Sequence, residues 1–217
     1  RASAPADKRG ADRDLGRSLD KLAGIHLQAG DSKAALEAVD QAIAIFAELA
    51  TDATDAEAQK DLAAAKARRA AILMNRGNTG KALEDATESL ATRQKLSGAA
   101  PDDAGRQRDL AAGLDALAGL QLLTGKTKEA VANAERLLAF RKELAAKLPD
   151  QPEVKRELAD AYKRLGEVHL ERAQVTKARD VYREGLAELK KLAEEDDKSV
   201  TAKAELAAMY GRRAQAQ

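Results

Sequence analysis

Residues 13–24 read RDLGRSLDKLAG, and residues 108–119 read RDLAAGLDALAG. An acidic residue followed by leucine opens both stretches, and this pair recurs along the chain as Asp14-Leu15, Asp61-Leu62, Asp109-Leu110, Glu157-Leu158 and Glu205-Leu206. Successive pairs lie 47, 48, 48 and 48 residues apart. A fixed period of this length indicates tandem structural repeats.

Each repeat contains two stretches in which apolar residues recur every three or four positions, as Leu15, Leu19 and Leu22 do. This is the period of an amphipathic helix, and the alternation typical of strands is absent. A short break separates the two stretches, with glycine at Gly30, Gly77 and Gly125 but alanine in the fourth repeat. Polar or proline-containing joints such as Pro101-Asp102 separate the repeats.

The pattern predicts helices over 12–29, 32–51, 56–76, 80–97, 103–123, 127–148, 153–172, 175–194 and 199–217. Residues 1–11 contain Pro5 and Gly10 and are expected to form a flexible N-terminal segment. Residues 12–217 are expected to form a single repeat domain, with units over about 12–54, 55–101, 102–149 and 150–197 and a half-unit over 198–217.

Composition agrees with long helices, because 44% of the residues are hydrophobic, 34% are charged and only 2% are aromatic. The 37 basic and 36 acidic residues nearly balance, which argues against a general attraction to nucleic acid or to anionic membranes. No apolar run is long enough to span a membrane. The absence of cysteine excludes disulfides and cysteine-based metal sites. The sequence starts at Arg1, so we interpret it as a fragment or processed product, and we expect it to be cytoplasmic.

The repeats resemble the tetratricopeptide repeat (TPR) family in its extended bacterial variant, over about residues 12–217. The first repeat carries the resemblance at Leu22-Ala23, Gly30-Asp31, Ala35 and Ala42, and the fourth at Leu165-Gly166, Ala178 and Gly185. The resemblance implies an all-α, right-handed superhelix, a TPR-like solenoid of four helix-pair repeats plus a terminal helix. It also implies a scaffold that binds a protein or peptide on its concave first-helix face, and no catalysis.

Basic residues stand just before the family's conserved leucine position, as Lys21, Arg68, Arg164 and Arg212, and small residues stand two places after it. We interpret these positions as a partner-binding surface, and an acidic partner segment would suit it. The residues of this hypothesis are Arg17, Lys21, Gly24, Arg68, Gly119, Lys163, Arg164 and Arg212. The alternatives are that the basic side chains only fill a solvated helix face and that the small residues only allow close helix packing.

Lys66 and Arg69 are anomalous, because they stand where the other repeats place core residues such as Leu19 and Leu22. A buried charge without a partner is costly. We therefore expect a carboxylate beside Arg69, or a charged head that reaches water. Drift in a degenerate repeat is the alternative explanation for both residues.

Nothing in the sequence predicts an active site, a metal site or a cofactor. His26 and His169 share one repeat position and are expected to pack between helices. The predicted function is therefore a protein-binding scaffold. Two alternatives stay open: a regulatory arm of a larger kinase-like or protease-like enzyme, and a homo-oligomer that assembles through the terminal helix 199–217.

Overall fold

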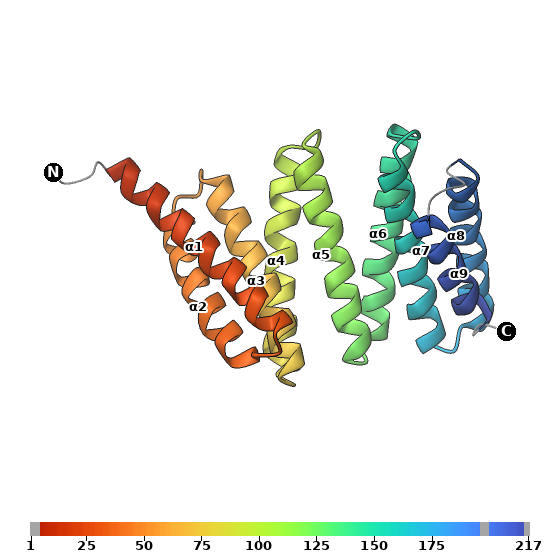
Figure 1. The fold of residues 1–217 in the computed structure, drawn as a ribbon, viewed down its shortest axis with the longest axis horizontal. Coiled ribbons are helices and arrows are strands. Elements are labelled where there is room, and N and C mark those ends of the chain that lie inside the picture. The colour runs from red at the N-terminus through yellow and green to blue at the C-terminus, as the bar shows by residue number, and fades with distance from the viewer. Residues whose placement is uncertain (1–4, 196–199, 215–217) are drawn as a thin grey trace. The chain divides into compact units, whose positions relative to one another are not determined.

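The computed structural model describes residues 5–195 and 200–214, and the regular elements in these ranges are all α-helices (Figure 1). Their bounds are α1 (Pro5–Gln28), α2 (Ser32–Leu49), α3 (Ala56–Asn75), α4 (Thr79–Ala99), α5 (Ala104–Leu123), α6 (Thr127–Lys147), α7 (Pro152–Glu171), α8 (Val175–Glu195) and α9 (Val200–Ala214). The predicted all-α repeat fold is confirmed. The last residues of the expected terminal helix, 215–217, lie outside the described residues, as do 196–199.

The chain divides into two compact units, residues 1–116 and residues 117–217, and the boundary falls inside α5. Each unit is described by itself. The single domain expected over 12–217 stays a prediction.

Helix α1 begins seven residues earlier than predicted, at Pro5. Residues 5–11 therefore belong to the helix, and residues 1–4 lie outside the described part, so the flexible N-terminal segment expected over 1–11 stays a prediction. Proline is tolerated at the start of a helix because the first backbone N–H has no helical partner. Arg9 ties this end down, since its Nη2 donates to the Leu49 carbonyl at 3.2 Å and to Asp55 Oδ2 at 3.0 Å.

The helix ends in the first unit follow from side chains at the predicted joints. Asp31, Asp55 and Asn78 each accept a hydrogen bond from a backbone N–H three residues later, which caps α2, α3 and α4. Before α2 and α4, Gly30 and Gly77 take φ angles of +81° and +76°. These left-handed turns reverse the chain, so that the two helices of a repeat lie antiparallel.

Each unit has its own hydrophobic core between its helix pairs. In the first unit the buried residues Ala35, Val39 and Phe46 of α2 pack with Ile72 of α3. In the second unit Tyr182 and Leu186 of α8 pack with Met209 of α9. The second helix of one repeat therefore covers the first helix of the next, as it does for α2 and α3, α6 and α7, and α8 and α9.

Candidate functional site

The first helices of the first unit, α1 and α3, contact each other, and two pairs of opposite charges connect them. Arg17 Nε donates to Asp61 Oδ2 at 2.9 Å. In the opposite direction, Arg68 of α3 donates from Nε and Nη2 to the two carboxylate oxygens of Asp20, at 2.7 and 3.0 Å. The hydrogen bond that Arg17 donates to Asp61 is the largest of the effects that raise the pKa of the Arg17 guanidinium.

The predicted small residues lie under arginine side chains. A Cβ at Gly24 would come within 2.8 Å of Arg68 Nη1. In the second unit, a Cβ at Gly119 would lie 3.6 to 3.7 Å from the guanidinium atoms of Arg164. The structure thus brings Gly24 together with Arg68, and Gly119 together with Arg164. Each pair joins a first helix to the first helix of the following repeat.

The remaining residues of the hypothesis lie in the second unit, except for Lys21. Arg164 Nη1 and Arg212 Nη2 lie 3.1 and 3.5 Å from the carboxylate of Glu167, and Lys163 Nζ lies 2.6 Å from Asp160 Oδ1. Lys21 of α1 is exposed. The first-helix arginines of the hypothesis are therefore ion-paired, and an incoming acidic group would compete with Asp20, Asp61 or Glu167.

The two anomalous basic residues of α3 have carboxylate partners, which is the arrangement expected for Arg69. Arg69 donates to both carboxylate oxygens of buried Asp85 at 2.7 Å, and its Nη1 donates to Asp40 at 2.9 Å. Asp85 raises the pKa of the Arg69 guanidinium above its ordinary value, mainly through these hydrogen bonds. Lys66 Nζ lies 2.5 Å from Glu88 of α4.

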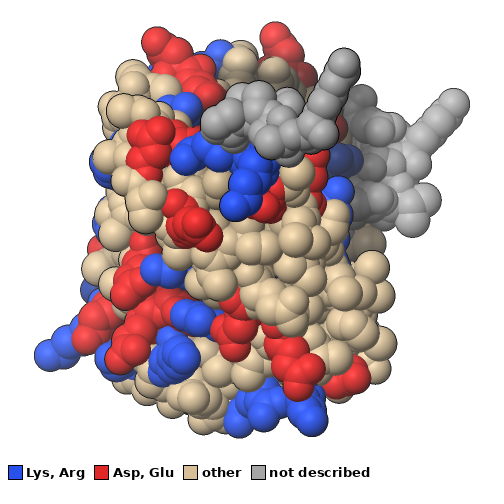
Figure 2. Space-filling model, turned by 90° about the vertical axis from the view of Figure 1, so that its left-hand side faces the viewer, with Lys and Arg blue, Asp and Glu red and all other residues tan. Residues whose placement is uncertain are grey.

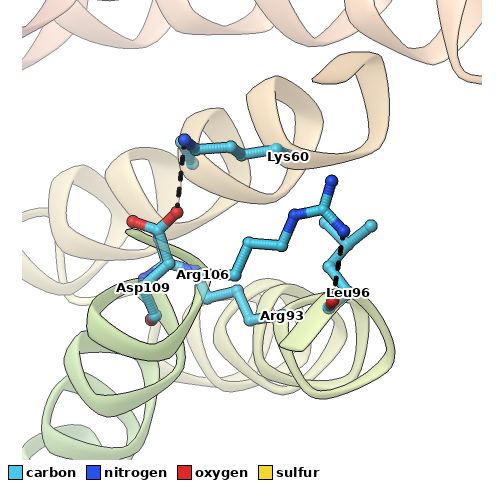
Figure 3. Close-up of a pocket in the computed structure, with 6 residues that line it drawn as sticks. Lys60, Arg93, Leu96, Arg106 and Asp109 are labelled. Atoms are coloured by element: carbon cyan, nitrogen blue, oxygen red, sulfur yellow. Dashed lines mark hydrogen bonds and ion pairs between the residues drawn. The ribbon is translucent and has the colours of Figure 1, made fainter. Parts of the chain in front are cut away.

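A small basic pocket in the first unit was not predicted from the sequence. Figure 3 shows it between α3, α4 and the start of α5, and its volume is about 30 Å³. It is lined by Lys60, Ala64, Arg93, Leu96, Arg106 and Asp109. Three of these residues are basic and one is acidic. Lys60 Nζ lies 3.6 Å from Asp109 Oδ2, and Arg106 Nη1 donates to the Leu96 carbonyl at 3.4 Å.

Arg93 is half-buried in this pocket. Its Nη1 donates to the Asp109 backbone carbonyl at 2.7 Å, and its stem packs against Gly113. Burial lowers the pKa of the Arg93 guanidinium, and the nearby charge of Asp109 offsets part of this effect. The group still stays protonated near neutral pH, because an arginine pKa starts so far above 7.

A comparison of repeat positions would have revealed the pocket. Arg93 stands at the position of Phe46 and Leu189, which are 1% and 3% exposed. Arg106 stands at the position of Ala58 and Val154, which are both fully buried. The predicted partner-binding surface contains only first-helix residues close to the conserved leucine position, so it includes neither Arg93 nor Arg106.

Helix α1 exposes three large apolar side chains, Leu15, Leu22 and Ile25. Leu22 and Ile25 are 41% and 62% exposed, whereas Leu165 and Val168, at the same positions of the fourth repeat, are 5% and 0% exposed. Figure 2 shows this side of the molecule, where uncharged surface lies among interspersed acidic and basic side chains. A hollow of about 320 Å³ adjoins Leu15 between α1 and α2.

Other chemistry finds little support in the described part of the chain. His169 is buried, and its Nδ1 lies 2.8 Å from Gln174 Oε1. Over the described ranges, no group of three or more histidine, aspartate or glutamate side chains could hold a metal ion. None of the helices described is both long and apolar enough to cross a membrane.

No family model matches the sequence, and the search of curated proteins finds no match. Among solved structures, a candidate kinesin light chain from Podosopora anserina with nearly identical TPR-like repeats aligns with a TM-score of 0.67 at 22% identity, over 94% of this chain and 88% of that one. BtubC (BKLC) from P. vanneervenii aligns with a TM-score of 0.63 at 18% identity, over 94% of this chain and 76% of that one. The chain therefore has the fold of TPR-like helical-repeat proteins.

Proposed function

We propose that the chain is a protein-interaction scaffold that holds a partner segment along its first helices. The observation that carries the proposal is the side-by-side placement of successive first helices, α1 with α3 and α7 with α9. Arg17, Arg68 and Arg212 each reach from one first helix to a carboxylate on the next or the previous one. A partner segment lying across these helices would meet polar side chains from two repeats at once.

Two first-helix lysines, one exposed and one half-buried, are the first positions at which a partner would meet positive charge. Lys21 lies on α1 and Lys163 on α7, so each unit supplies one. The ion pair between Lys163 and Asp160 joins side chains that are 40% and 69% exposed. Such surface pairs contribute at most about 1 kcal/mol, so an acidic partner group can replace Asp160 at little cost.

The test is a charge reversal on the first helices, Lys21→Glu with Lys163→Glu. The matched control reverses two exposed lysines of second helices, Lys33→Glu with Lys177→Glu, and changes the net charge equally. Both variants are first checked for unchanged helicity by circular dichroism. We expect the first-helix variant to lose the proteins that the parent chain captures from a source lysate, while the control keeps them. Equal capture by both variants would contradict the proposal.

Self-association is a second candidate, and the exposed apolar side chains of α1 are the observation that favours it. The equivalent residues of the fourth repeat, Leu165 and Val168, are buried. A second copy of the chain would bury Leu22 and Ile25 of α1 in the same way. We expect the sedimentation coefficient to rise with concentration, and Ile25→Lys to abolish the rise. A coefficient that stays constant up to high micromolar concentration would rule this candidate out.

A further inference from the structure

The basic pocket between α3, α4 and α5 interrupts the apolar packing of the repeats. Arg93 replaces residues that are fully apolar in the first and fourth repeats, and Arg106 replaces residues that are fully buried in the second and fourth. Placing a charged group where a hydrocarbon would pack lowers stability unless an opposite charge compensates it. Two such replacements therefore meet at one joint of the repeat array.

The carboxylate nearest to Arg93 is already engaged elsewhere. Asp109 directs its carboxylate toward Lys60, and it offers Arg93 only its backbone carbonyl (Figure 3). The same repeat position in the second unit shows the alternative. There Arg141 donates directly to the carboxylate of Glu157, the residue that corresponds to Asp109. Compared with Arg141, Arg93 lacks a carboxylate partner within ion-pair distance among the described residues.

The second arginine of the pocket makes only long contacts with its acceptors. Arg106 Nε lies 3.4 Å from Asp103 Oδ2, and its Nη1 donates to a backbone carbonyl at 3.4 Å. Both distances are longer than those of strong charge-assisted hydrogen bonds. Two guanidinium groups thus line one opening, and both retain donor capacity for an anion.

We propose that this pocket accepts the side-chain carboxylate of an aspartate or glutamate on the partner segment, with Arg93 and Arg106 as donors. The volume of about 30 Å³ gives room for about two water-sized groups, which matches the two oxygens of a carboxylate. A phosphate group carries more oxygens and fits this space less well. The inference rests on the proposed scaffold function only in that a partner protein carries the carboxylate.

The test is a titration of the full chain with N-acetyl-glutamate amide, followed through the NMR signals of the arginine Nε–Hε groups. We expect saturable shifts at Arg93 and Arg106 and none at Arg141, which already holds Glu157. The uncharged analogue N-acetyl-glutamine amide should cause no such shifts. Inorganic phosphate should bind more weakly than the carboxylate, and tighter binding of phosphate would overturn the choice of ligand.

Three variants separate the pocket from general charge effects. Arg93→Gln should weaken binding about tenfold or more, because it removes a charge-assisted bond. Arg183→Gln removes the same charge from an exposed position on α8 and should leave the affinity unchanged. Arg93→Met keeps the apolar stem, so it should retain the fold by circular dichroism while losing the ligand.

Absence of saturable shifts in the parent chain, or full affinity in Arg93→Gln, would overturn the pocket proposal. Neither result would affect the scaffold proposal, which is tested through Lys21 and Lys163 on other helix surfaces. If the first-helix variant loses capture but the parent chain shows no saturable shifts, the scaffold proposal stands and the pocket proposal fails.

Discussion

Arg69 joins three helices, because it extends from α3 to Asp85 on α4 and Asp40 on α2. The first repeat places Leu22 and Ala38 at the positions of Arg69 and Asp85. An ion pair in the second repeat thus replaces an apolar pair in the first. The need for a carboxylate beside Arg69 was predictable from the cost of burying a charge. The identity of Asp85 follows only from a comparison of the repeats, because it stands at the position of Ala38.

Breaking this pair on one side should be far more costly than removing both partners. Arg69→Leu alone leaves Asp85 buried without its partner, and it should lower the free energy of unfolding by about 3 kcal/mol. The double variant Arg69→Leu with Asp85→Ala recreates the residues of the first repeat and should come within about 1 kcal/mol of the parent. Urea unfolding of the parent, both single variants and the double variant measures the coupling. If the loss in the double variant equals the sum of the two single losses, Arg69 and Asp85 do not stabilise the chain through each other, which would contradict this account.

Ala173 adopts a φ of +53° at the turn where the other repeats have glycine. This left-handed conformation is unfavourable for a residue with a Cβ. Ala173→Gly should therefore stabilise the chain by about 1 kcal/mol. The reverse change at the equivalent turn, Gly125→Ala, should destabilise it by a similar amount. Melting temperatures that move the same way in both variants would contradict this account.

The repeat pattern predicted a turn at Ala173, but it did not predict the positive φ of this residue. Its side chain gives no local signal for a positive φ, and only the surrounding helix pair imposes the conformation. Ala173 N–H donates to the Leu170 carbonyl at 2.8 Å, and Gln174 N–H donates to the His169 carbonyl at 2.9 Å. These bonds close the end of α7 as the bonds of Gly30 and Asp31 close α1.

At the scale of elements, the close approach of α7 and α8 depends on Gly166. A Cβ at this position would clash with the ring of Tyr182, whose side chain is fully buried. A phenol ring fixed in a core cannot move away without disturbing its neighbours. The small residue that matched the family pattern is thus required by helix packing.

Gly166→Ala should accordingly lower the free energy of unfolding by about 1–3 kcal/mol, as overpacking does. Gly98 is the control, because it also lies in a helix and has no atom within 4 Å of its Cβ position. Gly98→Ala should stabilise the chain by about 0.5–1 kcal/mol through helix propensity alone. Chemical denaturation compares the two, and equal effects would show that Tyr182 does not restrict Gly166.

The helices themselves were largely predictable, because amphipathic periodicity and capping residues act within a few positions of the chain. The predicted bounds of α2 and α3 differ from the observed ones by at most two residues. The start of α1 was wrong because Pro5 and Gly10 were interpreted as helix breakers. The bonds from Arg9 to Leu49 and Asp55 cross 40 and 46 residues, and local sequence carries no signal for them.

At the scale of the whole molecule, the contribution of an apolar side chain to stability depends on which repeat it belongs to. Ile25 and Ile72 are equivalent, yet they are 62% and 0% exposed. Ile72→Ala should lower the free energy of unfolding by about 2–4 kcal/mol, because it leaves a cavity beside α2. Ile25→Ala should change it by about 0.5 kcal/mol or less in dilute solution. A large cost at Ile25 that grows with protein concentration would instead indicate self-association.

The candidate site was predictable only in part. The positions of the first-helix basic residues followed from the repeat pattern, but their ion pairs across helices did not. Asp20 and Arg68 lie 48 residues apart, and their pairing depends on how α1 and α3 pack. The basic pocket forms where α3, α4 and α5 meet, and the pattern within any one helix does not predict it.

The most direct test of the scaffold proposal is site-specific photo-crosslinking. A photoreactive amino acid replaces Lys21 or Lys163 on the first helices, or Lys33 or Lys177 on the second helices, and the chain is irradiated in lysate. We predict that both first-helix positions crosslink to one and the same protein and that the second-helix positions do not. Crosslinks to that protein from the second-helix positions alone would contradict the central claim that the first helices form the binding surface.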